Sequence, residues 1–432
     1  MSRPTRPRVA VVGAGWAGLA AAVTLADWAD LTVFEAGRVA GGRARRLAAP
    51  ASEGVFDNGQ HLLLGAYQHC LQLMRQVGAN PDTLLWRVPQ RLEMADEFCL
   101  TLPRLPAPLN QLAGWLGLRG LSWAERWAWL RALLHLRRQG FTVPATQTVA
   151  HWLAEQRQSA RLVRCFWEPL VLAALNTPLA QASMQVLATV LRDGVAGPAA
   201  HSEMLMPKVD LSALFPEPAL HWLRAQGHAT RLANRVKSLL PDADGVTVDA
   251  ERFDAVVLAT APQHLAALLP ATAQDWLAPV NKLGYQPIYT VYLRAQQPAA
   301  LPQAWLGLAG EPWGQWVFDR QRCVGQAGWL AVVISGPGPH QALSAETLLQ
   351  HTAAMLNRRF PDLRAQAEGR VIAEQRATFS CDAGMERIHP RSPWPRLVLA
   401  GDHVAGPYPA TLEGAVRSGA HAAHILEKVL NC

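Results

Sequence analysis

Residues 9–18 read Val-Ala-Val-Val-Gly-Ala-Gly-Trp-Ala-Gly, and this stretch decides the fold. The apolar run Val9–Val12 predicts a buried parallel strand, and the spaced glycines after it predict a tight turn into a helix. In such a turn Gly13 lets the chain reverse, Gly15 lets the backbone approach a pyrophosphate, and Gly18 lets the helix pack closely on the sheet. The helix then presents its N-terminal N–H groups and positive dipole end to phosphate. The stretch therefore predicts a dinucleotide-binding turn.

An acidic residue stands at the spacing that this turn requires. Glu35 closes a second apolar run, Leu31–Phe34, and lies 22 positions after Gly13. A carboxylate at the end of the second strand can bind a ribose 2′-OH. An ordinary solvated acid is the alternative, and the spacing favours ribose binding.

A signal peptide or a membrane span competes for the same region. Arg3, Arg6 and Arg8 precede residues 9–26, which carry no charge. The three glycines break that run, and Asp27 follows it at once. The residues therefore favour the nucleotide-binding interpretation.

A second glycine turn lies near the C-terminus. The apolar run Leu397–Ala400 leads into Gly401 and Asp402, and a Gly- and Ala-rich helical stretch ends the chain. A buried-strand pattern, Phe253–Thr260, stands between the two turns. We expect the fold to bring both glycine turns to one parallel sheet, where they form halves of one site.

Size, charge and cysteine usage limit the class of protein. With 432 residues the chain can hold two sizeable domains. Its formal charge of +7 comes almost entirely from Arg, and no Lys/Arg cluster of nucleic-acid type is present. The six cysteines are scattered, and the histidines lack an H-E-x-x-H pattern. We therefore expect no nucleic-acid partner, no metal site, and a cytoplasmic protein with free thiols.

Nucleotide-binding elements occur in three separate pieces, 1–95, 205–280 and 395–432. Between them lies first a helical insertion, 96–204, that is rich in Trp and Leu. A second insertion, 281–394, carries extended runs. This order predicts an α/β fold, in which an inserted α+β substrate-binding domain accompanies a Rossmann-like parallel-sheet domain.

These motifs resemble the flavin amine oxidase and phytoene desaturase superfamily. Its members carry the glycine turn, an acid followed by G-G-R (here 41–43), an A-T-x-P-like turn (here 259–262) and a terminal G-D before a flavin-facing helix. Within it, Phe56–His61, Met206–Ser212 and Ala400–His403 resemble the squalene-associated branch, the hydroxysqualene dehydroxylases. The resemblance covers nearly the whole chain and implies FAD as the cofactor.

The resemblance also implies which residues hold FAD. It places the guanidinium fork of Arg43 at phosphate, with a surface charge as the alternative, and the backbone of Val236 at adenine. Asp402 is implied at the pyrophosphate and ribityl chain, where it can also cap a helix. The implied cofactor-binding set is Gly13, Gly15, Trp16, Ala17, Gly18, Glu35, Gly42, Arg43, Gly59, Gln60, His61, Val236, Thr260, Gly401, Asp402, Leu412, Glu413, Gly414 and Ala415.

The branch implies a reductive reaction in squalene and hopanoid biosynthesis. Hydride from reduced flavin replaces the hydroxyl group of hydroxysqualene as water leaves, and squalene is formed. The partner is a long apolar isoprenoid, so the pocket must be long, apolar and poor in water. An electron donor must also reduce the flavin.

Departure of the hydroxyl group calls for a proton donor, and the residues leave its identity open. His61 and Asp57 are the catalytic candidates, because the superfamily places the strand-like run Phe56–Leu64 near the flavin. Either residue can instead be structural. The further candidates are His403, Tyr408 and Glu413.

The segment Trp115–Leu136 combines Trp and Leu with several Arg. This composition is typical of an amphipathic helix at a membrane interface and predicts peripheral contact with the inner face of the cell membrane. A core helix with solvated Arg side chains is the alternative. The sequence carries no signal for the oligomeric state.

Four rival functions stand beside the dehydroxylase. An oxidative carotenoid- or squalene-type desaturase would remove hydride on the same scaffold. A flavin amine oxidase commonly has a Lys near the flavin, and the flanks of Lys208, Lys237 and Lys282 do not suggest one. The other two are a non-catalytic FAD-binding scaffold at the membrane and an NAD(P)-only dehydrogenase, which the G-G-R and G-D motifs disfavour.

Overall fold

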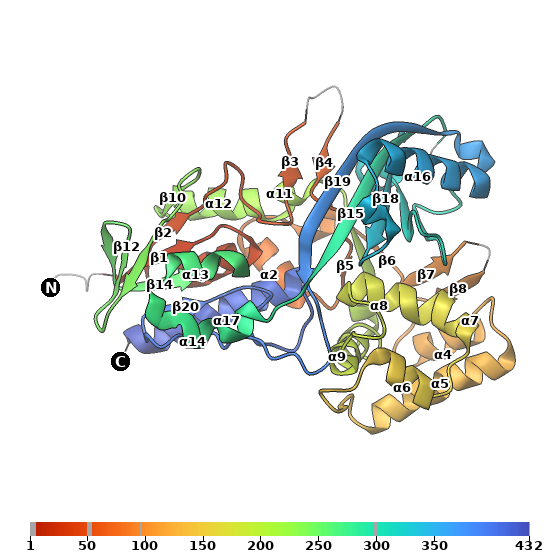
Figure 1. Ribbon diagram of the computed structural model, residues 1–432, viewed down its shortest axis with the longest axis horizontal. Helices are drawn as coiled ribbons and strands as arrows, with labels where there is room; N and C mark the ends of the chain where they lie inside the picture. The colour runs from red at the N-terminus through yellow and green to blue at the C-terminus, as the bar shows by residue number, and fades with distance from the viewer. Residues whose placement is uncertain (1–5, 50–53, 96, 298–299, 432) are drawn as a thin grey trace.

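A parallel sheet forms one side of the computed structural model, which describes residues 6–49, 54–95, 97–297 and 300–431 (Figure 1). Its strands lie in the order β10-β2-β1-β14-β20, and all neighbouring pairs are parallel. The predicted α/β fold with a Rossmann-like sheet is therefore confirmed. The strands are β1 (Arg8–Val12), β2 (Asp30–Phe34), β10 (Ala229–Arg231), β14 (Ala255–Leu258) and β20 (Leu397–Leu399).

Two helices from opposite ends of the chain lie side by side against this sheet. α1 (Trp16–Leu25) follows β1, and α17 (Leu412–Leu430) ends the described chain beside it. Small residues allow their close approach, since a Cβ atom at Gly419 would lie 2.1 Å from the carbonyl oxygen of Ala17. Residues 9–26 thus form a strand and a buried ten-residue helix. Within the described part of the chain, no helix has the length and hydropathy that crossing a bilayer needs.

A second sheet of seven strands lies beside the first, in the order β19-β15-β18-β17-β16-β7-β8. Its two longest strands, β15 and β19, run antiparallel from the parallel sheet toward helix α16 (Ala345–Arg359) (Figure 1). Side chains such as Val291, Leu330 and Leu356 form a buried core between this sheet and α16. The strands are β7 (Arg91–Met94), β8 (Phe98–Thr101), β15 (Tyr285–Ala295), β16 (Trp305–Gly307), β17 (Trp316–Asp319), β18 (Trp329–Ser335) and β19 (Ala365–Phe379).

The first insertion is helical and lies under the second sheet (Figure 1). The segment Trp115–Leu136 is not one helix, because the chain leaves the helix at Gly117 and restarts it at Ser122. There the Ser122 hydroxyl and the Glu125 carboxylate form a capping box. The helices are α4 (Leu109–Leu116), α5 (Trp123–Arg138), α6 (Val149–Glu155), α7 (Ala160–Leu162), α8 (Glu168–Leu175), α9 (Met184–Gly194) and α10 (Ala199–Ser202).

The remaining elements are short. The strand-like run Phe56–Leu64 is two separate two-residue strands with a bend between them. The other elements are α2 (Gln68–Gln76), α3 (Pro81–Leu84), α11 (Leu211–Leu214), α12 (Pro216–Ala225), α13 (Leu265–Leu268), α14 (Gln274–Asn281), α15 (Arg320–Val324), β3 (Arg46–Leu47), β4 (Phe56–Asp57), β5 (Leu63–Leu64), β6 (Leu85–Val88), β9 (Met204–Pro207), β11 (Leu239–Pro241), β12 (Val246–Val248) and β13 (Glu251–Phe253). The division of the chain into two domains stays a prediction.

Gly18→Ala tests the close packing of α1. A Cβ atom there would lie 1.9 Å from the carbonyl oxygen of Gly13, so the helix must shift. We expect the free energy of unfolding of the FAD-loaded protein to fall by about 1–3 kcal/mol, measured by urea denaturation. Gly406→Ala is the matched control, because its nearest neighbour would be 3.8 Å away. Equal stability of the two variants would contradict this packing.

Candidate functional site

A single cavity of about 1440 Å³ connects the parallel sheet to the helical insertion. It exceeds the roughly 300–1,000 Å³ of an ordinary ligand pocket, and can hold a dinucleotide together with a second ligand. One end is lined by the two glycine turns and by Val236. The other is lined by side chains of α4, α5 and α8.

The glycine turn after β1 leaves open space and free N–H groups at the first end of this cavity. Gly13 has a φ of +109°, and a Cβ atom there would lie 2.5 Å from the carbonyl oxygen of Ala259. A Cβ atom added at Gly15 would have the Cα atom of Gly42 as its nearest neighbour, at 3.9 Å. α1 begins directly afterwards without a side-chain cap, so its first N–H groups have no partner within the helix. This cradle fits a pyrophosphate.

Glu35 is locked in place beside the turn. One carboxylate oxygen accepts the N–H of Ala14 at 2.8 Å and the other accepts the N–H of Gly37 at 2.7 Å. A carboxylate has about four lone-pair positions, so two remain for ribose hydroxyls on the cavity side. The position fits the predicted ribose contact.

Arg43 and Asp402 form an ion pair on the cavity wall. Nη2 of Arg43 lies 2.6 Å from Oδ1 of Asp402, and Nη1 donates to the carbonyl oxygen of Ala377 at 2.8 Å. Burial by itself raises the pKa of Asp402, but the charge and hydrogen bond of Arg43 together with the neighbouring His403 outweigh burial and hold the pKa well below its usual range. Protein acceptors thus engage both Nη atoms of Arg43, and one hydrogen on each, with Nε, is left for phosphate.

Two side chains near the glycine turns, at the first end of the cavity, carry buried polar atoms without a protein partner. They are the hydroxyl of Thr260 and both ring nitrogens of His403. The imidazole lies 3.8 Å from the Asp402 carboxylate, which is too long for a hydrogen bond. Buried polar atoms are rarely left unsatisfied, so these two point to a bound polar ligand.

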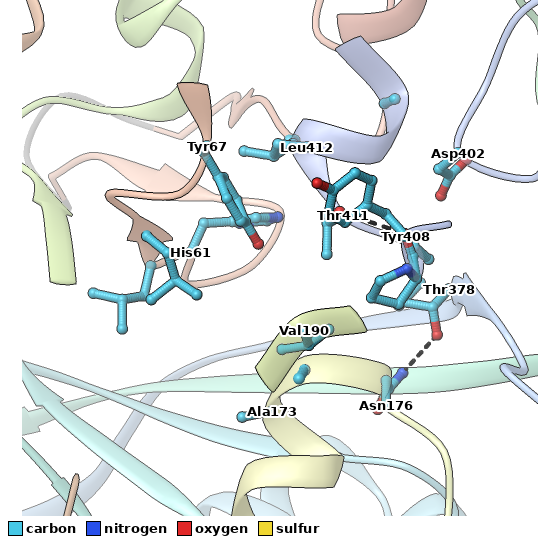
Figure 2. A pocket seen from close by; sticks show the side chains of 18 of the residues that line it. His61, Tyr67, Ala173, Asn176, Val190, Thr378, Asp402, Tyr408, Thr411 and Leu412 are labelled. Carbon is cyan, nitrogen blue, oxygen red and sulfur yellow. Dashed lines mark hydrogen bonds between the residues drawn. The ribbon is translucent and has the colours of Figure 1, made fainter. Parts of the chain in front are cut away.

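The start of α17 contributes backbone and apolar atoms to the cavity. The hydroxyl of Thr411 caps the helix by accepting the N–H of Gly414 at 3.1 Å, and Leu412 and Ala415 line the cavity. Gly414 does not line it. The helix N-terminus faces the junction between the two ends of the cavity, where Figure 2 shows Thr411 and Leu412.

Glu413, predicted as a cofactor contact and a candidate acid, lies outside the cavity lining. Its buried carboxylate accepts the backbone N–H groups of His69 at 3.1 Å and Cys70 at 3.0 Å. It also accepts Nε of Arg417 at 2.7 Å. These contacts turn the side chain toward the N-terminus of α2, so Glu413 joins α17 to α2.

Asp57, predicted as a catalytic candidate, is also absent from the cavity lining. Its carboxylate accepts the N–H of Leu211 at 3.0 Å, and its carbonyl oxygen accepts the hydroxyl of Tyr292 at 3.1 Å. Burial raises the pKa of Asp57 to about 7. The residue ties β4 to the segment before α11.

His61 does line the cavity, as predicted, but as a proton acceptor. Its Nδ1 lies 3.1 Å from the carbonyl oxygen of Gly59, which can only accept, so Nδ1 carries the hydrogen and Nε2 has a free lone pair. Burial lowers the pKa of the imidazole, and the charge of Arg43 adds to this effect. The ring is therefore neutral at neutral pH.

Most of the other residues that were predicted to contact the cofactor line the same cavity. Gly18 does not, because it packs against the Gly13 carbonyl instead. The predicted residues that line the cavity are Gly13, Gly15, Trp16, Ala17, Glu35, Gly42, Arg43, Gly59, Gln60, His61, Val236, Thr260, Gly401, Asp402, Leu412 and Ala415.

Polar side chains that the sequence did not single out gather at the junction, where they meet the candidate Tyr408 (Figure 2). Tyr67 faces the cavity beside Thr411, and Asn176 donates to the hydroxyl of Thr378 at 3.0 Å. Asp193 of α9 accepts the hydroxyl of Tyr408 at 2.6 Å. These residues belong to no motif, so only their positions in the folded chain connect them.

A model of the family described as flavin containing amine oxidoreductase matches residues 16–426. The hydroxysqualene dehydroxylase of Rhodopseudomonas palustris is 29% identical over 461 residues, which cover 97% of this chain and 98% of that protein. The hydroxysqualene dehydroxylase of Zymomonas mobilis is 27% identical, with coverage of 96% and 98%. A probable zeta-carotene desaturase of Synechococcus elongatus is 23% identical, again with coverage of 96% and 98%.

Solved structures share the fold. An oxidoreductase from Methanosarcina mazei superposes with a TM-score of 0.73 at 16% identity, covering 98% of this chain and 100% of that one. Cyclohexylamine oxidase from Brevibacterium oxydans superposes with a TM-score of 0.70 at 19% identity, covering 99% and 100%. The similarity supports the two-sheet architecture described above.

Asp402→Asn tests the ion pair with Arg43. Because its pKa is lowered in the folded state, the Asp402 carboxylate stabilises the fold above about pH 4, and this contribution is lost as the pH falls through the folded-state pKa. We expect the variant to lose about 1–3 kcal/mol of unfolding free energy at pH 7. Urea denaturation of the FAD-loaded proteins at neutral and acidic pH measures it.

The difference in unfolding free energy between wild type and variant should become smaller at acidic pH, because the wild-type carboxyl group of residue 402 is then neutral as well. Asp27→Asn, at an exposed position, is the control. A difference that stays constant down to strongly acidic pH would show that charge pairing is not its cause.

Proposed function

Because this chain belongs to the family of flavin-containing amine oxidoreductases, and is an FAD-dependent oxidoreductase, we propose that it converts hydroxysqualene into squalene. The observation that carries the proposal is the two-ended cavity. Its nucleotide end fits FAD, and its other end is a long space walled by Leu, Trp and Phe side chains. The relatives named hydroxysqualene dehydroxylase, matched over nearly their full length, support it.

The proposed reaction balances with one hydride and one proton. The carbon–oxygen bond of the allylic alcohol breaks, a hydride takes the place of the hydroxyl group, and the oxygen leaves as water. FAD, once reduced by an external electron donor, supplies the hydride. The chain itself must bind the isoprenoid, keep water out and deliver a proton to the oxygen.

The positions of the sequence candidates give most of them little support as the proton donor. Asp57 and Glu413 lie outside the cavity lining. The hydroxyl of Tyr408 donates to Asp193, and His61 offers an acceptor nitrogen to the cavity. His403 remains, and it stands on the nucleotide side beside Asp402.

Tyr67 is the group that we propose as the donor. Its phenol lies on the cavity wall at the junction, beside the first residues of α17. Burial raises the pKa of Tyr67 above its usual range, so the hydroxyl keeps its proton at neutral pH. A phenol is still a stronger acid than water, so it can protonate a departing hydroxide.

An oxidative desaturase is the second candidate function. The similarity to a probable zeta-carotene desaturase favours it, because the same cavity can hold an isoprenoid that gives up hydride instead of receiving it. The amine oxidase alternative has less support at the junction. Of the three mid-chain lysines, only Lys237 lines the cavity, and it stands next to Val236 at the nucleotide end.

Anaerobic flavin reoxidation tests the proposed function. We expect that the purified protein, once its flavin is reduced, is reoxidised by hydroxysqualene with formation of one squalene per flavin. Absorbance of the flavin and chromatography of the extracted lipid measure the two events. Two results together would reverse the proposed direction of hydride transfer. In the first, the reduced flavin stays reduced when hydroxysqualene is added. In the second, the oxidised flavin becomes reduced when a desaturase substrate is added.

Tyr67→Phe tests the proton donor. Loss of the hydroxyl group should slow squalene formation about 100-fold or more, while the protein still binds FAD. The measurement is the single-turnover rate of flavin reoxidation. An unchanged rate would exclude Tyr67 as the donor.

Asp57→Asn is the companion variant, and it should keep the wild-type rate. It should also alter stability. A carboxyl pKa that folding raises to about 7 stabilises the fold at low pH, and this contribution is lost as the pH rises through about 7. The unfolding free energy of the Asp57→Asn variant should therefore not show this decrease as the pH rises through about 7.

A further inference from the structure

An exposed apolar surface lies on the helical insertion. Among the residues that the structure describes, most of the large apolar side chains that are exposed to solvent come from one short stretch of the chain, 105–134. We call this surface the α4–α5 face. Its members are Leu105, Leu109, Leu112, Leu116, Trp123, Trp127 and Leu134.

The α4–α5 face is held in a fixed shape. The buried ring of Trp115 contacts the rings of Trp123 and Trp127 edge-on, with centroids 5.9 and 5.0 Å away. The guanidinium of Arg126 lies 4.7 Å from the centre of the Trp123 ring. These contacts hold Trp123 and Trp127 in place, although 60% and 58% of their surfaces are exposed to solvent.

Cations outnumber acids in the segment that carries this face, and one of these cations, Arg104, is paired with Glu203 at 3.0 Å. Residues 98–154 contain six Arg, no Lys and a single acid, Glu125. The acid is engaged, because its carboxylate accepts the hydroxyls of Ser122 and Ser159 at 2.8 and 2.7 Å. The exposed cations among these residues are Arg104, Arg119, Arg131, Arg137 and Arg138. Aromatic and Leu side chains mixed with Arg match the headgroup region of an anionic bilayer.

The face is continuous with the cavity. Leu112, Trp127 and Leu134 are each more than 40% exposed, and the same three side chains line the apolar end of the cavity. Arg137 lines it as well. The cavity therefore opens within the α4–α5 face, between the two helices.

We propose that the α4–α5 face docks on an anionic lipid bilayer and that the isoprenoid passes from the lipid directly into the cavity between α4 and α5. The route of the substrate rests on the proposed function, whereas the docking itself does not. A second copy of this chain is a weaker occupant, because a two-fold contact would bring the Arg residues of both copies together. A bilayer with anionic headgroups removes this repulsion and covers the exposed apolar side chains at once.

Vesicle binding of the FAD-loaded protein tests the docking. Wild type should sediment with phosphatidylcholine vesicles that contain phosphatidylglycerol, more weakly with phosphatidylcholine alone, and more weakly in high salt. The variant L109S/L116S/W123S should bind about tenfold more weakly or worse. None of its three positions lines the cavity. Leu240→Ser, which changes a side chain 57% exposed on β11, is the matched control.

Activity in two forms of substrate separates the docking from the proposed function. With hydroxysqualene in the vesicles, the triple variant should turn over about tenfold more slowly than wild type, and in detergent at the wild-type rate. Wild type that stays in the supernatant, or a triple variant that binds vesicles as wild type does, would overturn the docking. If wild type forms a concentration-dependent dimer and the triple variant does not, a second copy of this chain binds the α4–α5 face instead of a bilayer. Vesicle binding without turnover in either form would refute the proposed function and leave the docking in place.

Discussion

The ion pair between Arg43 and Asp402 is the interaction on which the cavity depends. Its two residues are separated by 359 positions, and Nη1 of the same guanidinium also holds the carbonyl oxygen of Ala377 at the end of β19. One side chain thus joins the Gly-Gly-Arg segment at 41–43, the last glycine turn and a long strand of the second sheet. Because Asp402 is nearly fully buried, its carboxylate would be costly without this partner, by several kcal/mol.

Around this pair the fold separates polar from apolar functions along one cavity. The carboxyl ends of the parallel strands supply backbone N–H groups, Glu35 and unpartnered polar atoms at one end. Helices of the first insertion supply the apolar walls at the other. A reaction between a polar cofactor and a hydrocarbon needs both surfaces to meet where water is scarce. The start of α17, with Thr411 and Leu412, stands at that boundary (Figure 2).

The two helices α4 and α5 face the cavity on one side and the surroundings on the other. Trp127 and Leu134 belong to both surfaces, which gives a physical reason for the richness of this segment in large apolar side chains. A buried core helix would need such residues only on its inner side. The break at Gly117 and the capping box at Ser122 separate the two helices.

The sequence by itself was sufficient to predict the glycine turn, the position of Glu35 at the end of the second strand, the parallel sheet and the family to which the chain belongs. These features depend on local backbone freedom and on the spacing between strand ends, which adjacent residues encode. It did not determine which way a side chain on a turn or helix points, because packing against distant segments decides that. Glu413 turns to the N-terminus of α2 and Asp57 to the N–H of Leu211, so neither reaches the cavity.

Tertiary structure alone also brought Tyr67 to the junction and joined Tyr408 to Asp193. No local pattern marks these residues, since each contact closes a loop through other segments of the chain. The same holds for the opening between α4 and α5, which exists only because a turn divides what the composition suggested as one helix. Local chemistry thus specified the glycine turns at the strand ends, and long-range packing decided which side chains line the cavity.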